Sequence, residues 1–170
     1  MRSLVIGSLF LASLLGASGA SAAGSSTIVI SEFRTRGPNG MNDEFIELHN
    51  KSSAAVNIAG WQVMLSNDLG QTTLAATIGS GVTIPAARFY LLANKAAQGY
   101  SGSVAPDATY TSPIADDGGI ALFDENSAIV DQVGMSTGSA YFEGTPLSAM
   151  MANANQSYER NFGGCSPNQD

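Results

Sequence analysis

Hydrophobic and polar residues alternate in short runs along most of the chain beyond residue 27, and turn-forming residues separate the runs. In Glu44–Asn50, Ile46 and Leu48 fall on one face of an extended strand, because successive side chains point to opposite faces. Such runs at regular spacing predict an all-β sandwich or barrel. The predicted strands are Ile28–Phe33, Glu44–Asn50, Trp61–Ser66, Gln71–Leu74, Val82–Pro85, Arg88–Ala93, Gly119–Asp124, Ala128–Val133 and Ser157–Asn161.

Two stretches depart from this alternation. Asn94–Asp117 is long, polar and contains proline, so we predict mostly loop there. In "TPLSAMMANANQS" the apolar residues recur at helical spacing behind a possible cap and a first-turn proline. A short helix and a loop that covers the end of the sandwich both fit this second stretch. Its residues in question are Thr145, Pro146, Leu147, Met150, Met151 and Ala154.

The first residues have the layout of a secretory signal peptide. Arg2 precedes the apolar run Leu4–Leu15, and small residues follow with an A-x-A pattern ending at Ala22. The apolar run is too short to span a bilayer. We therefore expect residues 1–23 to be a cleaved signal peptide, and the protein to be secreted or periplasmic without an integral membrane span.

The remaining chain has room for one domain, which we place at residues 24–163, followed by a tail at 164–170. Cys165 is the single cysteine of the chain, so no intramolecular disulfide can form. Its loop-like setting, "GGCSPNQD", leaves two interpretations open. Either the chain stops short of its natural end, or the cysteine is incidental.

The chain is acidic, with 14 Asp and Glu against 7 Lys and Arg and a net charge of −7. Loss of Arg2 with the signal peptide makes the balance more negative. Nucleic-acid affinity depends largely on Lys and Arg, and anionic lipids likewise attract basic segments. The charge therefore favours neither nucleic acid nor an anionic membrane surface as a partner.

Five motifs in order resemble the lamin tail domain family. "IVISEF" resembles its opening strand, and "DEFIELHNKSSAAVNIAGWQV" its most diagnostic segment. "VTIPAARFYLLA", "GGIALFDENSAIVDQVGM" and "SYERN" resemble its later strand, its hairpin and its closing motif. Two departures stand out: Asn126-Ser127 replace the hairpin glycine that is common in the family, which leaves the turn type open, and residues 94–117 do not align.

The resemblance implies an immunoglobulin-like β-sandwich that acts as a non-catalytic binding module. In bacteria such domains occur in exported proteins, sometimes beside hydrolase or nuclease domains, and there the closing motif often runs into an acidic, Asn-rich tail. The nucleic-acid binding of the eukaryotic domain rests on basic surface, which this chain lacks, and is not carried over. The partner implied is a protein at the cell envelope or outside the cell.

The carboxylates of the diagnostic segment suggest an active site at first sight. Glu44 and Glu47 lie three apart, however, and on a regular strand they point to opposite faces, whereas acid/base pairs converge on one reacting centre. We expect them, with Asp43, to hydrogen-bond loop backbone or to solvate a sheet edge. Asp131 shares a face with Ile129 and Val133 and is expected to be partly buried and to tie down a nearby loop, unless a bulge turns it outward.

Other candidate chemistry is weak. Asp116, Asp117, Asp124 and Glu125 match no calcium-loop spacing, and we interpret them as turn acids. His49 is the single histidine and has no nucleophile elbow or second metal ligand to work with. We accordingly predict no enzyme, no catalytic, cofactor-binding or metal-binding residues and no cofactor.

The positions of the aromatic residues distinguish a sandwich with aromatic side chains in its core from one with a carbohydrate-binding surface. As core residues they support the sandwich alone, whereas several on one exposed face would make a carbohydrate-stacking platform. A carbohydrate- or calcium-binding surface sandwich, and an accessory module of a longer secreted hydrolase or nuclease, therefore stay as alternatives to a protein-binding or surface-tethering module. The aromatic residues concerned are Trp61, Phe89, Tyr90, Tyr100, Tyr110, Phe123, Tyr141 and Tyr158.

Overall fold

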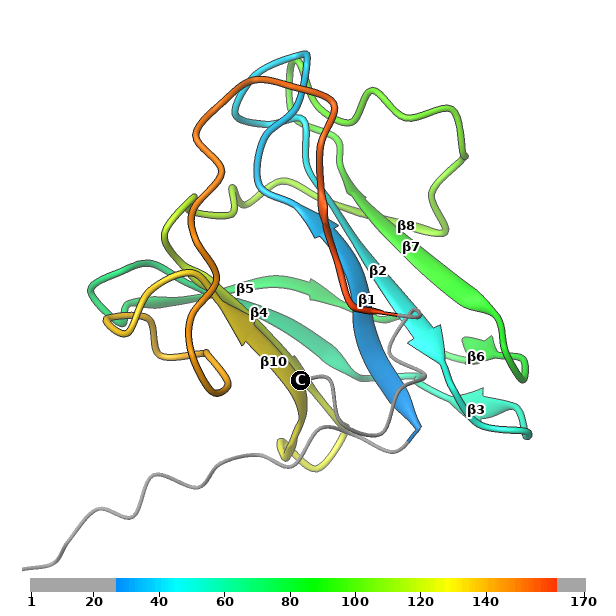
Figure 1. The fold of residues 1–170 in the computed structure, drawn as a ribbon. Coiled ribbons are helices and arrows are strands. Elements are labelled where there is room, and N and C mark those ends of the chain that lie inside the picture. The colour runs from blue at the N-terminus through cyan, green and yellow to red at the C-terminus, as the bar shows by residue number, and fades with distance from the viewer. Residues whose placement is uncertain (1–26, 162–170) are drawn as a thin grey trace, which may run out of the picture.

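The computed structural model describes residues 27–161, which contain eleven strands and no α-helix (Figure 1). The predicted signal peptide, the tail and Cys165 lie outside the described residues. The strands are β1 (Ile28–Arg34), β2 (Phe45–Asn50), β3 (Val56–Asn57), β4 (Gln62–Ser66), β5 (Thr72–Thr77), β6 (Thr83–Ile84), β7 (Phe89–Asn94), β8 (Ala108–Tyr110), β9 (Gly119–Phe123), β10 (Ile129–Gly134) and β11 (Tyr158–Glu159).

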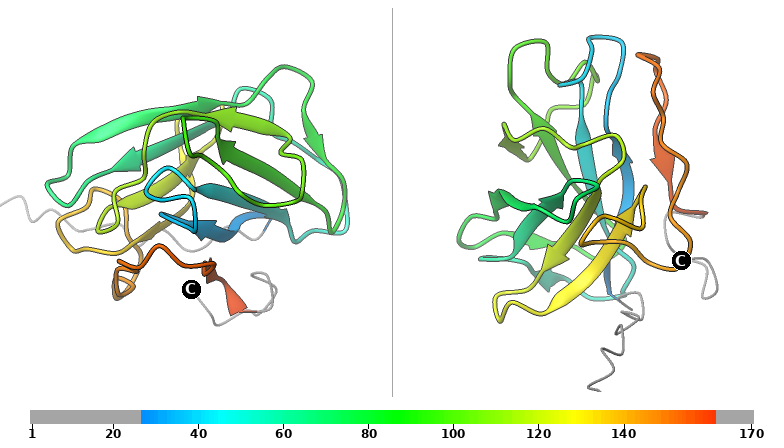
Figure 2. Two further views of the ribbon diagram at one scale, coloured as in Figure 1. Left: turned by 90° about the horizontal axis from the view of Figure 1, so that it is seen from above. Right: turned by 90° about the vertical axis from the view of Figure 1, so that its left-hand side faces the viewer.

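Two sheets face each other as the layers of a β-sandwich, which confirms the predicted fold class (Figures 1 and 2). One sheet has the order β11-β1-β2-β7-β8 and the other the order β10-β9-β4-β5, while β3 and β6 form a small two-stranded sheet. All paired strands are antiparallel except β7 and β8.

The core follows from the alternation in the sequence. Ile46 and Leu48 of β2 are fully buried, and so are Ile120 and Leu122 of β9 in the opposite sheet. Burying one such side chain contributes roughly 1.5–3 kcal/mol, so the facing apolar rows supply the main drive to pack the sheets. Trp61 is only 7% exposed at the start of β4, and its indole Nε1 donates to the Glu125 carboxylate at 2.8 Å.

Three parts of the chain differ from the prediction. β8 lies within the stretch predicted as loop, and β3 lies between the predicted strands Glu44–Asn50 and Trp61–Ser66, where no strand was predicted. Both are two- or three-residue strands that need a neighbour from elsewhere in the sequence, so no alternation is long enough to signal them. β5 is also longer than the predicted strand and extends to Thr77.

The helix considered for the "TPLSAMMANANQS" stretch does not form. Leu147 N donates to Gly134 O at 2.9 Å, and the Tyr158 hydroxyl bonds Ser148 O and Met150 N, each at 2.8 Å. These bonds, together with the pairing of β11 with β1, hold residues 143–161, which we call the C-terminal strap, in an extended path beside β1 (Figure 2). A helix over this stretch would forfeit the bonds of Leu147, Ser148 and Met150.

The hairpin between β9 and β10 closes with a left-handed residue. Ser127 has φ 64°, in the place where a glycine is common in this hairpin of the resembling family. Its N–H donates to Asp124 O at 3.1 Å, and the Asp124 carboxylate accepts the N–H groups of Asn126 and Ala128. The side chain of Asp124 thus stabilises a turn whose left-handed residue has no glycine.

Candidate functional site

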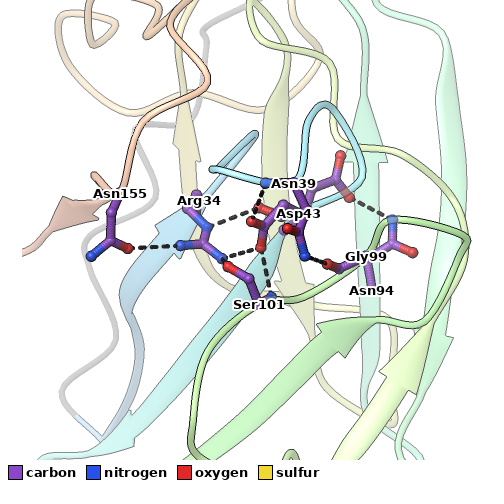
Figure 3. A network of polar contacts seen from close by, with 8 residues as sticks. Arg34, Asn39, Asp43, Asn94, Gly99, Ser101 and Asn155 are labelled. Atoms are coloured by element: carbon purple, nitrogen blue, oxygen red, sulfur yellow. Dashed lines mark hydrogen bonds and ion pairs between the residues drawn. The ribbon is translucent and has the colours of Figure 1, made fainter.

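Asp43 and Glu44, two acids of the diagnostic segment, form a buried polar network at one end of the sandwich, and Figure 3 shows the contacts of Asp43. The Asp43 side chain is fully buried and forms an ion pair with Arg34. Its carboxylate also accepts the backbone N–H groups of Ser101 at 2.8 Å and Asn39 at 2.9 Å. Burial alone raises the pKa of Asp43, but these hydrogen bonds and the Arg34 charge outweigh it, so its pKa lies below the ordinary value.

Glu44 is also fully buried, but its environment favours the neutral acid. Its carboxyl oxygens accept the Ile114 N–H at 2.9 Å and the Asn94 side-chain N–H at 2.8 Å. Burial outweighs these bonds and raises the pKa of Glu44 to about 8. The buried Tyr110 hydroxyl interacts with the same carboxyl group without reaching hydrogen-bond geometry.

This network fastens the long segment after β7 to the sheets. Asp43 bonds Ser101 and Glu44 bonds Ile114, while Asp116 pairs with Arg36 and accepts the Thr35 hydroxyl at 3.0 Å. The predicted hydrogen bonds from these carboxylates to loop backbone are therefore present. Glu47 serves elsewhere, since it accepts the Ser31 hydroxyl at 2.7 Å. None of these contacts brings Glu44 and Glu47 to a common partner.

Asp131 is buried more completely than predicted, at 1% exposure, and it connects strands rather than tying down a loop. It accepts the Ile30 N–H at 2.6 Å and pairs with Arg160 at 3.1 Å. A bulge does interrupt the β9–β10 register between Ile129 and Asp131, but it leaves Asp131 inside. Asp131 thereby joins β10 to β1 and to the residue that follows β11.

The remaining predicted residues lie apart from one another. His49 is 6% exposed and stacks on Phe89 with ring centroids 4.3 Å apart. Asp124 stabilises the β9–β10 turn and Glu125 accepts the Trp61 indole. Within residues 27–161, no three His, Cys, Asp or Glu side chains gather closely enough to hold a metal ion.

The aromatic residues do not assemble an exposed platform. Tyr110 and Tyr141 are buried, Phe33 stacks on Tyr158, and Phe89 alone among the described aromatic side chains is largely exposed, at 51%. Residues 27–161 therefore do not show the row of exposed aromatic side chains that would favour a carbohydrate-stacking surface.

The outer strand β5 is the feature best suited to contact another molecule. All its backbone partners lie on β4, and no strand within residues 27–161 pairs with its outer side. Four of its six side chains are exposed, including Leu74 at 46%. Residues 69–87 carry no charge at all, although the protein as a whole is acidic.

Edge strands of natural proteins are usually protected by lysine, proline, a bulge or a covering segment. Of these devices β5 has only a bulge, which leaves Ala75 without a partner on β4. No hydrogen bond within residues 27–161 occupies its outward backbone groups, and β8 of the facing sheet lies near β5 without pairing with it. We call Thr72–Thr77 with its outward backbone groups the open edge.

The family comparison supports the architecture described above. A family model described as Lamin Tail Domain matches residues 21–137, more than two thirds of the 170-residue chain. The chain belongs to the lamin tail domain family. The match covers β1 to β10, and the structure continues this lamin tail domain with the C-terminal strap and β11. A comparison with curated proteins gives no match.

Sequence reasoning missed the partners of its acids and the position of the open edge. The partners of the buried acids are Arg34 for Asp43, Asn94 for Glu44 and Arg160 for Asp131. The chain has only 7 Lys and Arg residues, so each arginine was a candidate partner for a buried acid. The edge position of β5 had no signal of its own except the uncharged run. No helix among residues 27–161 of this lamin tail domain is long and apolar enough to cross a membrane.

Proposed function

We propose that this lamin tail domain is an exported, non-catalytic module that binds or tethers a partner protein by adding a strand of that partner to β5. The observation that carries the proposal is the open edge, a six-residue outer strand without charge or proline that pairs with β4 alone among the strands of residues 27–161. Main-chain hydrogen bonds supply affinity in this mode of recognition, and alternate side chains supply specificity.

The buried acids support a structural rather than a chemical role for the other end of the sandwich. The carboxyl oxygens of three buried acids, Asp43, Glu44 and Asp131, accept backbone N–H groups of the same chain. Asp43 and Asp131 also form ion pairs with arginines. They hold the sandwich rigid while β5 remains open. The family assignment supports the same conclusion, and the N-terminal segment supports export.

The charge of the protein supports a protein partner. A net charge of −7 disfavours phosphate backbones and anionic headgroups, whereas the uncharged stretch 69–87 offers a local surface without repulsion. A neutral partner strand can therefore approach the open edge with little electrostatic cost.

A photo-crosslinking amino acid placed at Thr73 in cells that export the protein tests the proposal. We expect a discrete protein adduct from Thr73 and none from Ser53, an exposed loop residue. Thr77→Lys in the same strand should abolish the adduct, because a lysine on an edge discourages strand addition. Ser53→Lys makes the same charge change away from the edge and should leave the adduct intact. An adduct that survives Thr77→Lys, or no adduct at all, would refute strand addition at β5.

A further inference from the structure

A second feature lies on the opposite side of the sandwich from β5. A groove of about 380 Å³ runs between β1, β10 and the C-terminal strap, within the range of natural ligand sites. Ile30 and Phe33 line it from β1, Gln132 and Val133 from β10, and Leu147 and Tyr158 from the strap. The apolar part of this lining can receive side chains of a bound segment.

The walls of the groove are held by contacts within the chain. Arg160 donates to Ile30 O at 3.2 Å and to both Asp131 oxygens at 3.1 Å, and the Tyr158 hydroxyl bonds Ser148 and Met150. Ser31 donates to Glu47. These polar groups therefore build the groove and keep the strap in place.

Gln132 differs from them because its side chain has no hydrogen bond within residues 27–161. It is only 8% exposed, and a buried amide without partners is costly. Within residues 27–161 the Tyr110 hydroxyl is the one fully buried side-chain atom without a hydrogen bond. The amide atoms of Gln132 are therefore not fully buried and keep contact with solvent. Gln132 is one of the residues that line the groove, which places it beside any molecule bound there.

We propose that this groove binds an extended, neutral or basic peptide segment of a partner protein, with the Gln132 amide bonded to the peptide main chain. A carboxamide offers one acceptor and a donor group, which complement the N–H and C=O of a peptide unit. The Glu143 and Glu159 side chains in the lining disfavour an anionic segment. The site is separate from the open edge, so the two proposals stand or fall independently.

Selection of peptides from a random dodecapeptide library on the full chain, followed by calorimetry with the selected peptides, tests this site. Gln132→Leu should weaken their binding about tenfold or more, because two hydrogen bonds are lost and the peptide groups stay unpaired. Gln62→Leu makes the same change on β4, outside the groove, and should leave the affinity unchanged. Thr73→Lys at the open edge should also have no effect.

Two further measurements separate binding from a folding defect. Urea unfolding followed by Trp61 fluorescence should show that the Gln132→Leu protein is folded under the binding conditions. The side-chain amide NMR signals of Gln132 should shift when peptide is added to the unmodified protein. Peptides that bind the Gln132→Leu protein as tightly as the unmodified one would overturn the proposal. If no peptide is selected and the protein instead binds neutral oligosaccharides on an array in a way that depends on Gln132, the proposal would also be overturned.

Discussion

Glu44 gives the most informative test of the buried network, because its pKa of about 8 makes stability depend on pH in an unusual direction. In the unfolded chain its pKa is near the ordinary 4.5, so the unfolded state loses the proton first as pH rises. The folded state then binds more protons than the unfolded state, and the free energy of unfolding falls with rising pH. The Glu44 contribution is greatest below about pH 4.5 and levels off above about pH 8.

The size of the effect follows from the shift. Each pH unit inside this window changes the free energy of unfolding by about 1.4 kcal/mol. Between about pH 5 and pH 7.5 the Glu44 carboxyl should therefore remove about 3 kcal/mol of stability. Glu44→Gln keeps the shape of the side chain and an acceptor for the Ile114 N–H but cannot ionise, so its own cost does not vary with pH in this window.

Urea unfolding at several pH values measures this directly, with Trp61 as the single tryptophan reporter. The difference in free energy of unfolding between Glu44→Gln and the unmodified protein should shift in favour of the variant by about 3 kcal/mol from pH 5 to pH 7.5. Asp117→Asn removes an exposed carboxylate and serves as the control. Parallel pH curves for Glu44→Gln and the unmodified protein would refute the reasoning, since they would mean that Glu44 is ionised in the folded state.

Three further changes probe other contacts. Asp131→Ala should destabilise the protein by about 3–5 kcal/mol in urea unfolding, because it leaves Arg160 and the Ile30 N–H without their partner; a loss below 1 kcal/mol would contradict this. Ser127→Gly should raise the free energy of unfolding by up to about 1 kcal/mol, because glycine tolerates φ 64° without the Cβ penalty, and a lower stability would show that the turn prefers serine. Asp43→Asn should reduce stability at neutral pH and lose this effect in acid, since the pKa of Asp43 is lowered in the fold; an equal loss at all pH values would contradict the ion pair with Arg34.

The sequence by itself determined the fold class and most of the strands. Alternation with a period of two is a local property of the sequence. The positions of Ile46 and Leu48 therefore predict the buried face of β2 even when the partner sheet is not known. The apolar neighbours of Asp131 also predicted partial burial, but the bulge between Ile129 and Asp131 breaks that strand face and Ile129 is 40% exposed, so the full burial of Asp131 comes from its contacts with Ile30 and Arg160. The acids of the diagnostic segment were recognised as structural from spacing alone.

Only the tertiary structure decided which residues meet across long separations. The bonds from Glu44 to Ile114 and from Asp131 to Arg160 join residues 70 and 29 positions apart, and no local pattern encodes such partners. The extended path of the C-terminal strap has the same cause, because the bond from Leu147 N to Gly134 O of β10 and the bonds with the Tyr158 hydroxyl replace those that a helix would make internally.

The two proposed binding surfaces also depend on topology. A strand has the same alternation whether it lies at the edge or at the centre of a sheet, so β5 became an open edge only when β4 was found to be its single neighbour. Gln132 is an ordinary polar residue in the sequence, and it became a largely buried residue that lines a groove because β1 and the strap lie beside β10. Sequence periodicity reports which face of a strand is apolar, whereas the arrangement of the strands decides which backbone and side-chain groups are left for a partner.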